Sequence, residues 1–159
     1  GKNVLLVDCD MRKGRQHKIF NVSNARGYSN LLIDDFKNNY SSYVKNTEVK
    51  NLYLLTCGTV PPNPSELLNS SNYESILKVS RKNFDRIIID GVPVNGLSDS
   101  LIMASHVDRV ILVCACNHTN IDELNEAKKA LEKVDANIAG VVVNRTPQTK
   151  RGKYSNYYE

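Results

Sequence analysis

The chain has 159 residues, of which 41% are hydrophobic and 24% charged, and its formal net charge is +4. This length and composition fit one soluble globular domain with a single core. The longest apolar runs are strand-sized, far below the ~20 residues that span a bilayer, and a signal peptide is not expected because residue 1 leads directly into a strand pattern.

The apolar and turn patterns predict strands and helices that alternate along the chain. In the first half we expect a strand at 4–7, a helical turn at 16–20, a helix at 28–33 with Ser29 as N-cap, and a strand at 52–55. Between the last two, residues 37–50 should form a helix or loop that packs through Tyr40, Tyr43 and Val44.

In the second half we expect a helix with a capping box from Asn63 to Glu66, a helix around 76–79, and strands at 86–90 and 110–114 separated by a helix at 97–104. A helix at 120–134, capped by Asn120 and Glu123, and a strand at 138–143 complete the pattern.

This alternation predicts an α/β fold, a parallel sheet with helices on both faces. In such sheets ligands bind beyond the carboxyl ends of the strands. Asp8, Asp90 and Asn144 each stand at such an end. The shared position favours a functional site, although aspartate and asparagine also end strands for purely local reasons.

Two features of the composition bear on ligands. Basic side chains gather at residues 12–18 and 150–153, which suits phosphate or nucleic-acid binding and equally a solvated face; with so mild a net charge we expect no nucleic-acid partner. The 4 cysteines lack zinc-type spacing, so we interpret them as small buried hydrophobic residues in a reducing cytoplasm and predict no metal site from them.

Acidic residues follow two of the apolar strands. Asp8-Cys9-Asp10-Met11-Arg12 follows the first strand, and Asp90-Gly91-Val92-Pro93 follows the strand at 86–90. Such carboxylates can hold a hydrated Mg²⁺ ion that carries nucleotide phosphates, and a nearby carboxylate can accept the proton of an attacking hydroxyl. Each motif alone is only moderately specific.

Taken together, in this order, the motifs resemble the cytoplasmic kinase domain of bacterial tyrosine kinases. Asp8-x-Asp10-x-Arg12 resembles the second Walker motif of that family, and Asp90-Gly91-Val92-Pro93 its Walker B motif. The segment from Gly58 to Leu68, with Pro61-Pro62-Asn63-Pro64 at its centre, resembles the stretch that links a strand to a helix in the family. The resemblance runs from about residue 3 to the C-terminus.

The resemblance implies a P-loop-type fold of the partitioning-ATPase branch and an ATP- and Mg²⁺-dependent tyrosine autokinase that regulates capsular or extracellular polysaccharide synthesis and export. It implies Asp8 as the catalytic carboxylate, Asp10 and Asp90 at Mg²⁺, and Arg12 near the phosphates or at a subunit contact. Asn144 and Arg145 are then candidate adenine contacts. Residues 1–145 would be a partial kinase domain and 146–159 a tail whose Tyr154, Tyr157 and Tyr158 accept phosphate.

The resemblance also implies partners. They are neighbouring kinase subunits in a ring, a transmembrane activator, fused or separate, that holds the kinase at the inner face of the plasma membrane, and a cognate phosphatase.

One part of the family pattern is missing from this sequence. The chain contains no Gly-x-x-x-x-Gly-Lys-[Ser/Thr] segment, whose backbone N–H groups and lysine cradle nucleotide phosphates. We expect that segment, with its central strand, to precede residue 1, and we expect the chain without it to bind ATP weakly and to expose an apolar strand edge. A partitioning-type ATPase and a non-catalytic substrate or scaffold remain alternative readings.

Overall fold

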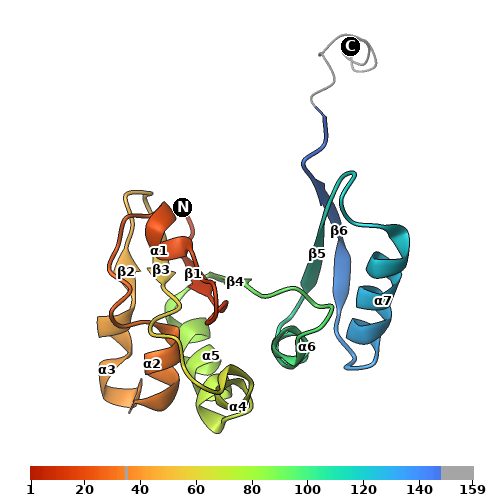
Figure 1. Cartoon of the computed structure of the whole chain (residues 1–159). Coiled ribbons are helices and arrows are strands. Elements are labelled where there is room, and N and C mark those ends of the chain that lie inside the picture. The colour runs from red at the N-terminus through yellow and green to blue at the C-terminus, as the bar shows by residue number, and fades with distance from the viewer. Residues whose placement is uncertain (35, 148–159) are drawn as a thin grey trace.

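The computed structural model describes residues 1–34 and 36–147 as two small sheets with helices packed against them (Figure 1). The first sheet has the order β2-β3-β1-β4. Its strands are β1 (Val4–Asp8), β2 (Lys45–Asn46), β3 (Leu52–Leu55) and β4 (Arg86–Asp90). β1 lies between β3 and β4 and pairs with both in parallel.

The sequence did not predict β2, which pairs antiparallel with β3 and adds one antiparallel strand to the expected parallel sheet. Only a short turn separates these two strands, and a short turn can join neighbouring strands only in the antiparallel sense. The segment 37–50 forms both this strand and the helix α3 (Phe36–Tyr43). The predicted packing points are confirmed, since Tyr43 is fully buried and Tyr40 and Val44 pack against the main core.

The second sheet pairs β5 (Val110–Ala115) in parallel with β6 (Ile138–Asn144). Helix α7 (Ile121–Glu132) makes the crossover between them. The predicted capping box is confirmed: the Glu123 N–H donates to Asn120 Oδ1 at 2.8 Å, and the Asn120 N–H donates to the Glu123 carboxylate at 3.3 Å. These two bonds satisfy N–H groups that the first turn would otherwise leave without partners.

The remaining helices lie close to their predicted places. They are α1 (Gln16–Ile19), α2 (Tyr28–Ile33), α4 (Pro64–Leu68), α5 (Ser71–Asn83) and α6 (Ser98–Ala104). None of the helices in the described ranges is long and apolar enough to cross a bilayer. The main core gathers around β1, α2 and α5, with Leu5, Leu31 and Ile76 almost fully buried, and a smaller core joins β5 to α7 through Leu112 and Leu131.

Two predicted helix starts need correction. Gly27, not Ser29, is the N-cap of α2, because the chain passes so close to Thr56 and Gly58 there that a Cβ atom would lie 2.3 Å from the Thr56 carbonyl oxygen. Ser29 lies within the helix, and its hydroxyl donates to the Thr59 carbonyl. Asn63 precedes α4 as expected, but its amide donates to the Glu66 carboxylate at 2.8 Å, so the capping box is absent.

Candidate active site

Two aspartates meet at the carboxyl ends of β1 and β4. Asp8 and Asp90 are register partners on these adjacent parallel strands. Gln16, the first residue of α1, connects them: its backbone N–H donates to Asp8 Oδ2 at 3.0 Å, and its side-chain amide donates to Asp90 Oδ2 at 2.6 Å. The sequence predicted that both aspartates lie at one rim, and their register on the adjacent strands confirms it. Gln16 was not predicted, because a glutamine at a helix start carries no signal for such a bridge.

The Asp8 side chain is fully buried, and its Oδ1 atom has no hydrogen-bond partner. Burial raises the pKa of Asp8, and the negative charges of Asp90 and Asp10 raise it further, while hydrogen bonds from backbone N–H groups oppose this. A carboxylate with one uncommitted oxygen and a raised pKa has the properties of a proton acceptor. The neighbouring carboxylates also concentrate negative charge that a divalent cation would neutralise.

The loop after β1 is held by its own side chains. Asp10 Oδ1 accepts backbone N–H groups of Arg12, at 3.1 Å, and of Lys13, at 2.8 Å. The Arg12 guanidinium forms an ion pair with Asp99 on α6, whose side chain is 1% exposed, whereas that of Arg12 is 35% exposed. The Ser65 hydroxyl of α4 donates to the other Asp99 oxygen. Arg12 therefore ties the acidic loop to two helices, a role that the motif alone did not reveal.

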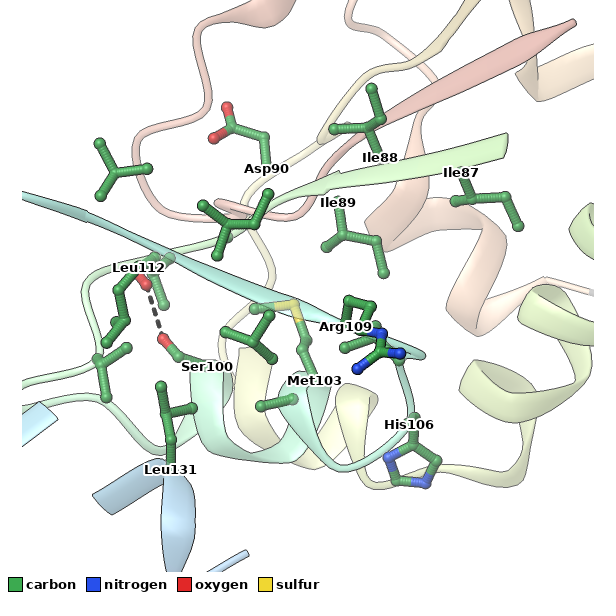
Figure 2. Close-up of a pocket in the computed structure, with 18 of the residues that line it drawn as sticks. Ile87, Ile88, Ile89, Asp90, Ser100, Met103, His106, Arg109, Leu112 and Leu131 are labelled. Carbon is green, nitrogen blue, oxygen red and sulfur yellow. Dashed lines mark hydrogen bonds between the residues drawn. The ribbon is translucent and has the colours of Figure 1, made fainter. Parts of the chain in front are cut away.

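A cleft of about 1530 Å³ separates β4 from β5. Figure 2 shows Ile87, Ile88, Ile89 and Asp90 along one wall, with Leu112 of β5 opposite and Met103 of α6 beneath. Both strands run in the same direction across this view. In the described part of the chain, each has only one paired edge. Ile88, Ile111 and Val113 stay 54%, 60% and 67% exposed, so the predicted apolar strand edge is present.

Asn144 and Arg145 close β6, the outer strand of the second sheet. Both are exposed, and the Arg145 N–H donates to Asn144 Oδ1 at 2.7 Å. β6 belongs to the second sheet, whereas Asp8 and Asp90 end strands of the first. Among residues 1–34 and 36–147, no hydrogen bond or ion pair joins Asn144 or Arg145 to either aspartate. The predicted acceptors Tyr154, Tyr157 and Tyr158 lie outside the described residues.

The sequence is similar to bacterial proteins named as tyrosine-protein kinases. CapB of Staphylococcus aureus, whose name describes a tyrosine-protein kinase, is 40% identical over 158 residues, which are 99% of this chain and 68% of CapB. The tyrosine-protein kinase wzc of Salmonella typhi is 33% identical over 162 residues, but the chain spans only 22% of its length. No protein-family model matches the chain.

Solved structures give the same result. A crystal structure of the chimerical protein CapA2B2 matches with a TM-score of 0.87 and 37% identity, covering 93% of this chain and 65% of that one. The kinase domain of the Escherichia coli tyrosine kinase ETK also matches with a TM-score of 0.87, at 28% identity, covering 99% of this chain and 61% of that one. The septum site-determining protein MinD of Pyrococcus horikoshii, solved with Mg-ADP, matches at 0.73 and 21% identity, covering 95% and 61%, which confirms the expected P-loop-type fold.

Proposed function

Because this chain belongs to the bacterial tyrosine-protein kinase family, we propose that it carries the carboxylate half of an ATP-dependent protein-tyrosine kinase site. The observation that carries the proposal is the buried Asp8 carboxylate, with Oδ1 unpartnered, beside Asp90 at the end of two parallel strands. Each strand ends in an aspartate at the carboxyl edge of the sheet, and open α/β sheets bind their ligands beyond that edge.

Asp8 acts as the proton acceptor in this proposal. A tyrosine oxygen attacks the γ-phosphorus of ATP, the bond from that phosphorus to the β-γ bridging oxygen breaks, and the hydroxyl proton moves to Asp8 as ADP leaves. The environment that raises the pKa of Asp8 brings its basicity closer to that needed at neutral pH. Gln16 holds Oδ2 through its N–H, which leaves Oδ1 for the proton.

Asp90 and Asp10 would hold Mg²⁺, in part through water. Asp90 is exposed and Asp10 is partly exposed, so both offer carboxylate oxygens to the ion beside the negative charge of Asp8. When bound, the ion neutralises phosphate charge. Gln16 orients Asp90 through the 2.6 Å bond, and the two backbone bonds to Asp10 fix the loop that presents it. Arg12 is a positioning residue here, because its guanidinium binds Asp99.

The cleft between β4 and β5 supplies the place for the phosphate-binding half. A strand inserted there in parallel would lie about 4.8 Å from each neighbour and would pair both free edges. Its own apolar side chains, and the helix that follows it, would cover Ile88, Ile111 and Val113. The P-loop would then emerge beside Asp90, which lines the same cleft. We therefore assign this cleft to the strand that leads into Gly-x-x-x-x-Gly-Lys-[Ser/Thr].

Nucleotide binding tests this assignment. We define the P-loop fusion as this chain preceded by the upstream segment of a related kinase that contains the motif. The fusion should bind Mg-ATP at least ~10²-fold more tightly than the chain alone, because each charge-assisted phosphate hydrogen bond contributes about 1.5–3 kcal/mol. Isothermal titration calorimetry measures the two affinities.

A matched pair of substitutions tests whether the added strand lies in the cleft between β4 and β5. Ile88→Lys puts a charge into the cleft, whereas Ile121→Lys changes an isoleucine that is 67% exposed outside it. In the fusion, Ile88→Lys should weaken ATP binding about tenfold or more, since a buried unpaired lysine costs several kcal/mol. In the chain alone it should shift stability by no more than ~0.5 kcal/mol. Equal effects of the two substitutions in the fusion would rule out strand insertion here.

The remaining roles follow the same proposal. Asn144 and Arg145 contact adenine from the end of β6. Residues 1–145 form a partial kinase domain, and Tyr154, Tyr157 and Tyr158 in the tail 146–159 accept phosphate from a neighbouring subunit of a ring. Each phosphate adds about two negative charges, whose repulsion would loosen the ring. A transmembrane activator, fused or separate, recruits the kinase to the inner face of the plasma membrane. A phosphatase removes the phosphate from the tail tyrosines. The phosphorylation state of the kinase in turn regulates polysaccharide synthesis and export.

A further inference from the structure

Three side chains from separate segments converge beside the end of β1. They are Asp8 of β1, His17 of α1 and Cys57, which follows β3. One possible ligand atom of each lies within 4.8 Å of the other two. β1 and β3 are adjacent parallel strands, which brings Asp8 and Cys57 to the same rim, and α1 adds His17. The sequence gives no sign of this cluster, because its members stand far apart along the chain.

Two atoms of this cluster are buried without a hydrogen-bond partner, Asp8 Oδ1 and His17 Nδ1. Asp8 is 0% exposed. An unpaired buried polar atom costs about 1–3 kcal/mol, and such atoms in a native protein call for an explanation, one of which is an ion. A cation between these side chains would bind one Asp8 oxygen, one His17 nitrogen and the Cys57 sulfur. The kinase chemistry accounts for Asp8 Oδ1 but not for the unpartnered His17 nitrogen or the converging Cys57 thiol, and these two groups point to a further ligand.

We propose that Asp8, His17 and Cys57 form a binding site for a transition-metal ion of the Zn²⁺ type. One carboxylate oxygen, one imidazole nitrogen and one thiolate sulfur are ligands that Zn²⁺ takes at about 2.0–2.3 Å, with a fourth position left for water. Mg²⁺ instead requires oxygen ligands in octahedral geometry. Ligands around a tetrahedral ion lie about 3.3–3.8 Å apart, so the three side chains need to close by about 1 Å.

Cys57 offers a buried free thiol to this site. The thiol donates to Asn24 Oδ1 at 3.5 Å, and the Asn24 amide donates to the sulfur at 3.4 Å. Asn24 therefore holds the sulfur in the position that faces Asp8 and His17.

The site shares Asp8 with the proposed kinase site, so occupation should inhibit phosphoryl transfer. This consequence rests on the proposed function, because a metal-bound Asp8 carboxylate cannot accept the tyrosine proton. The metal site itself does not depend on that function. Cys57 takes no part in the proposed transfer, so Cys57→Ser should leave the Mg-ATP-dependent rate of the P-loop fusion unchanged when Zn²⁺ is absent. The same substitution should remove inhibition by Zn²⁺.

Cobalt titration of the 159-residue chain tests the site directly. Co²⁺ replaces Zn²⁺ in such sites, and a thiolate ligand gives a near-ultraviolet charge-transfer band. We expect this band at one Co²⁺ per chain, its displacement by Zn²⁺ but not by excess Mg²⁺, and its loss in Cys57→Ser. His17→Gln should weaken Zn²⁺ binding by about tenfold or more, as measured against a chromophoric chelator.

Cys114→Ser is the matched control, because Cys114 is also a free cysteine but lies on β5. It should keep the band. The proposal is overturned if the parent chain shows no band, if the band survives in Cys57→Ser, or if it is lost in Cys114→Ser. Circular dichroism of each variant confirms that the fold is kept. These spectroscopic results stand whether or not the fusion phosphorylates tyrosine, so failure of the metal site and failure of the proposed function can be distinguished.

Discussion

Asp8→Asn should reduce tyrosine phosphorylation by the P-loop fusion by about 10²–10⁴-fold, the contribution typical of a positioned proton acceptor. The substitution keeps the size of the side chain and its hydrogen-bond acceptor for the Gln16 N–H, but an amide cannot take up the hydroxyl proton. ATP binding should change far less, because the phosphates are held by the P-loop. Single-turnover rates with Mg-ATP separate the two effects.

The same substitution should stabilise the protein, and more so as pH rises. Burial raises the pKa of Asp8 in the folded state, so the fold binds this proton more tightly than the unfolded chain does. Below the pKa that Asp8 has in the unfolded chain, the carboxyl is protonated in both states and its burial costs no ionisation free energy. As pH rises through the pKa of Asp8 in the folded state, the parent protein loses stability because the buried group must ionise. The difference in thermal midpoint between Asp8→Asn and the parent should grow over this pH range.

Asp135→Asn is the matched control for the effect on the rate. Asp135 is exposed and has a φ of 54°, a conformation that asparagine tolerates as well as aspartate does. This substitution should leave the rate of tyrosine phosphorylation unchanged. A transfer rate in Asp8→Asn within a factor of ~3 of the parent would exclude Asp8 as the proton acceptor, since proton transfer contributes at least ~10²-fold.

Arg12→Ala should destabilise the chain by about 2–3 kcal/mol, because it leaves the buried Asp99 carboxylate without its cation. The estimate lies below the range for fully buried pairs since the Arg12 side chain is 35% exposed, so solvent compensates part of the loss. Urea unfolding measures the change. Lys13→Ala is the control, because Lys13 is an exposed basic residue in the same loop.

A double-mutant cycle identifies the cause of that loss. When Asp99→Ala is already present, adding Arg12→Ala should cost less than ~0.5 kcal/mol, because the pair no longer exists. An undiminished effect of Arg12→Ala in the Asp99→Ala background would show that Arg12 does not act through Asp99.

The sequence predicted those features that depend on periodicity and strand ends. The five apolar strands fall within one or two residues of their predicted bounds, and Asp8 and Asp90 meet at one rim because parallel strands share their direction. The sequence also indicated an exposed apolar strand edge, and the structure places such edges at β4 and β5. Each of these inferences needs only local pattern and the topology of a parallel sheet.

The sequence did not predict features that depend on contacts between distant segments. Gln16 bridges two aspartates, and Asp99 receives Arg12 from a loop distant in sequence. Cys57 follows an apolar strand and was interpreted as a small hydrophobic residue, but β3 delivers it to Asp8 and His17. The Ser29 cap failed for a similar reason, because the close approach of Gly27 to Thr56 decides where α2 begins.

Peptide mapping of phosphate after incubation with Mg-ATP tests the central claim most directly. The chain and the P-loop fusion are compared by mass spectrometry. We expect phosphate on the tail peptide with Tyr154, Tyr157 and Tyr158 in the fusion only, and we expect its loss in Asp8→Asn. ATP hydrolysis by the fusion without any tyrosine phosphate would contradict the kinase function and favour a partitioning-type ATPase, and neither activity would favour a non-catalytic scaffold.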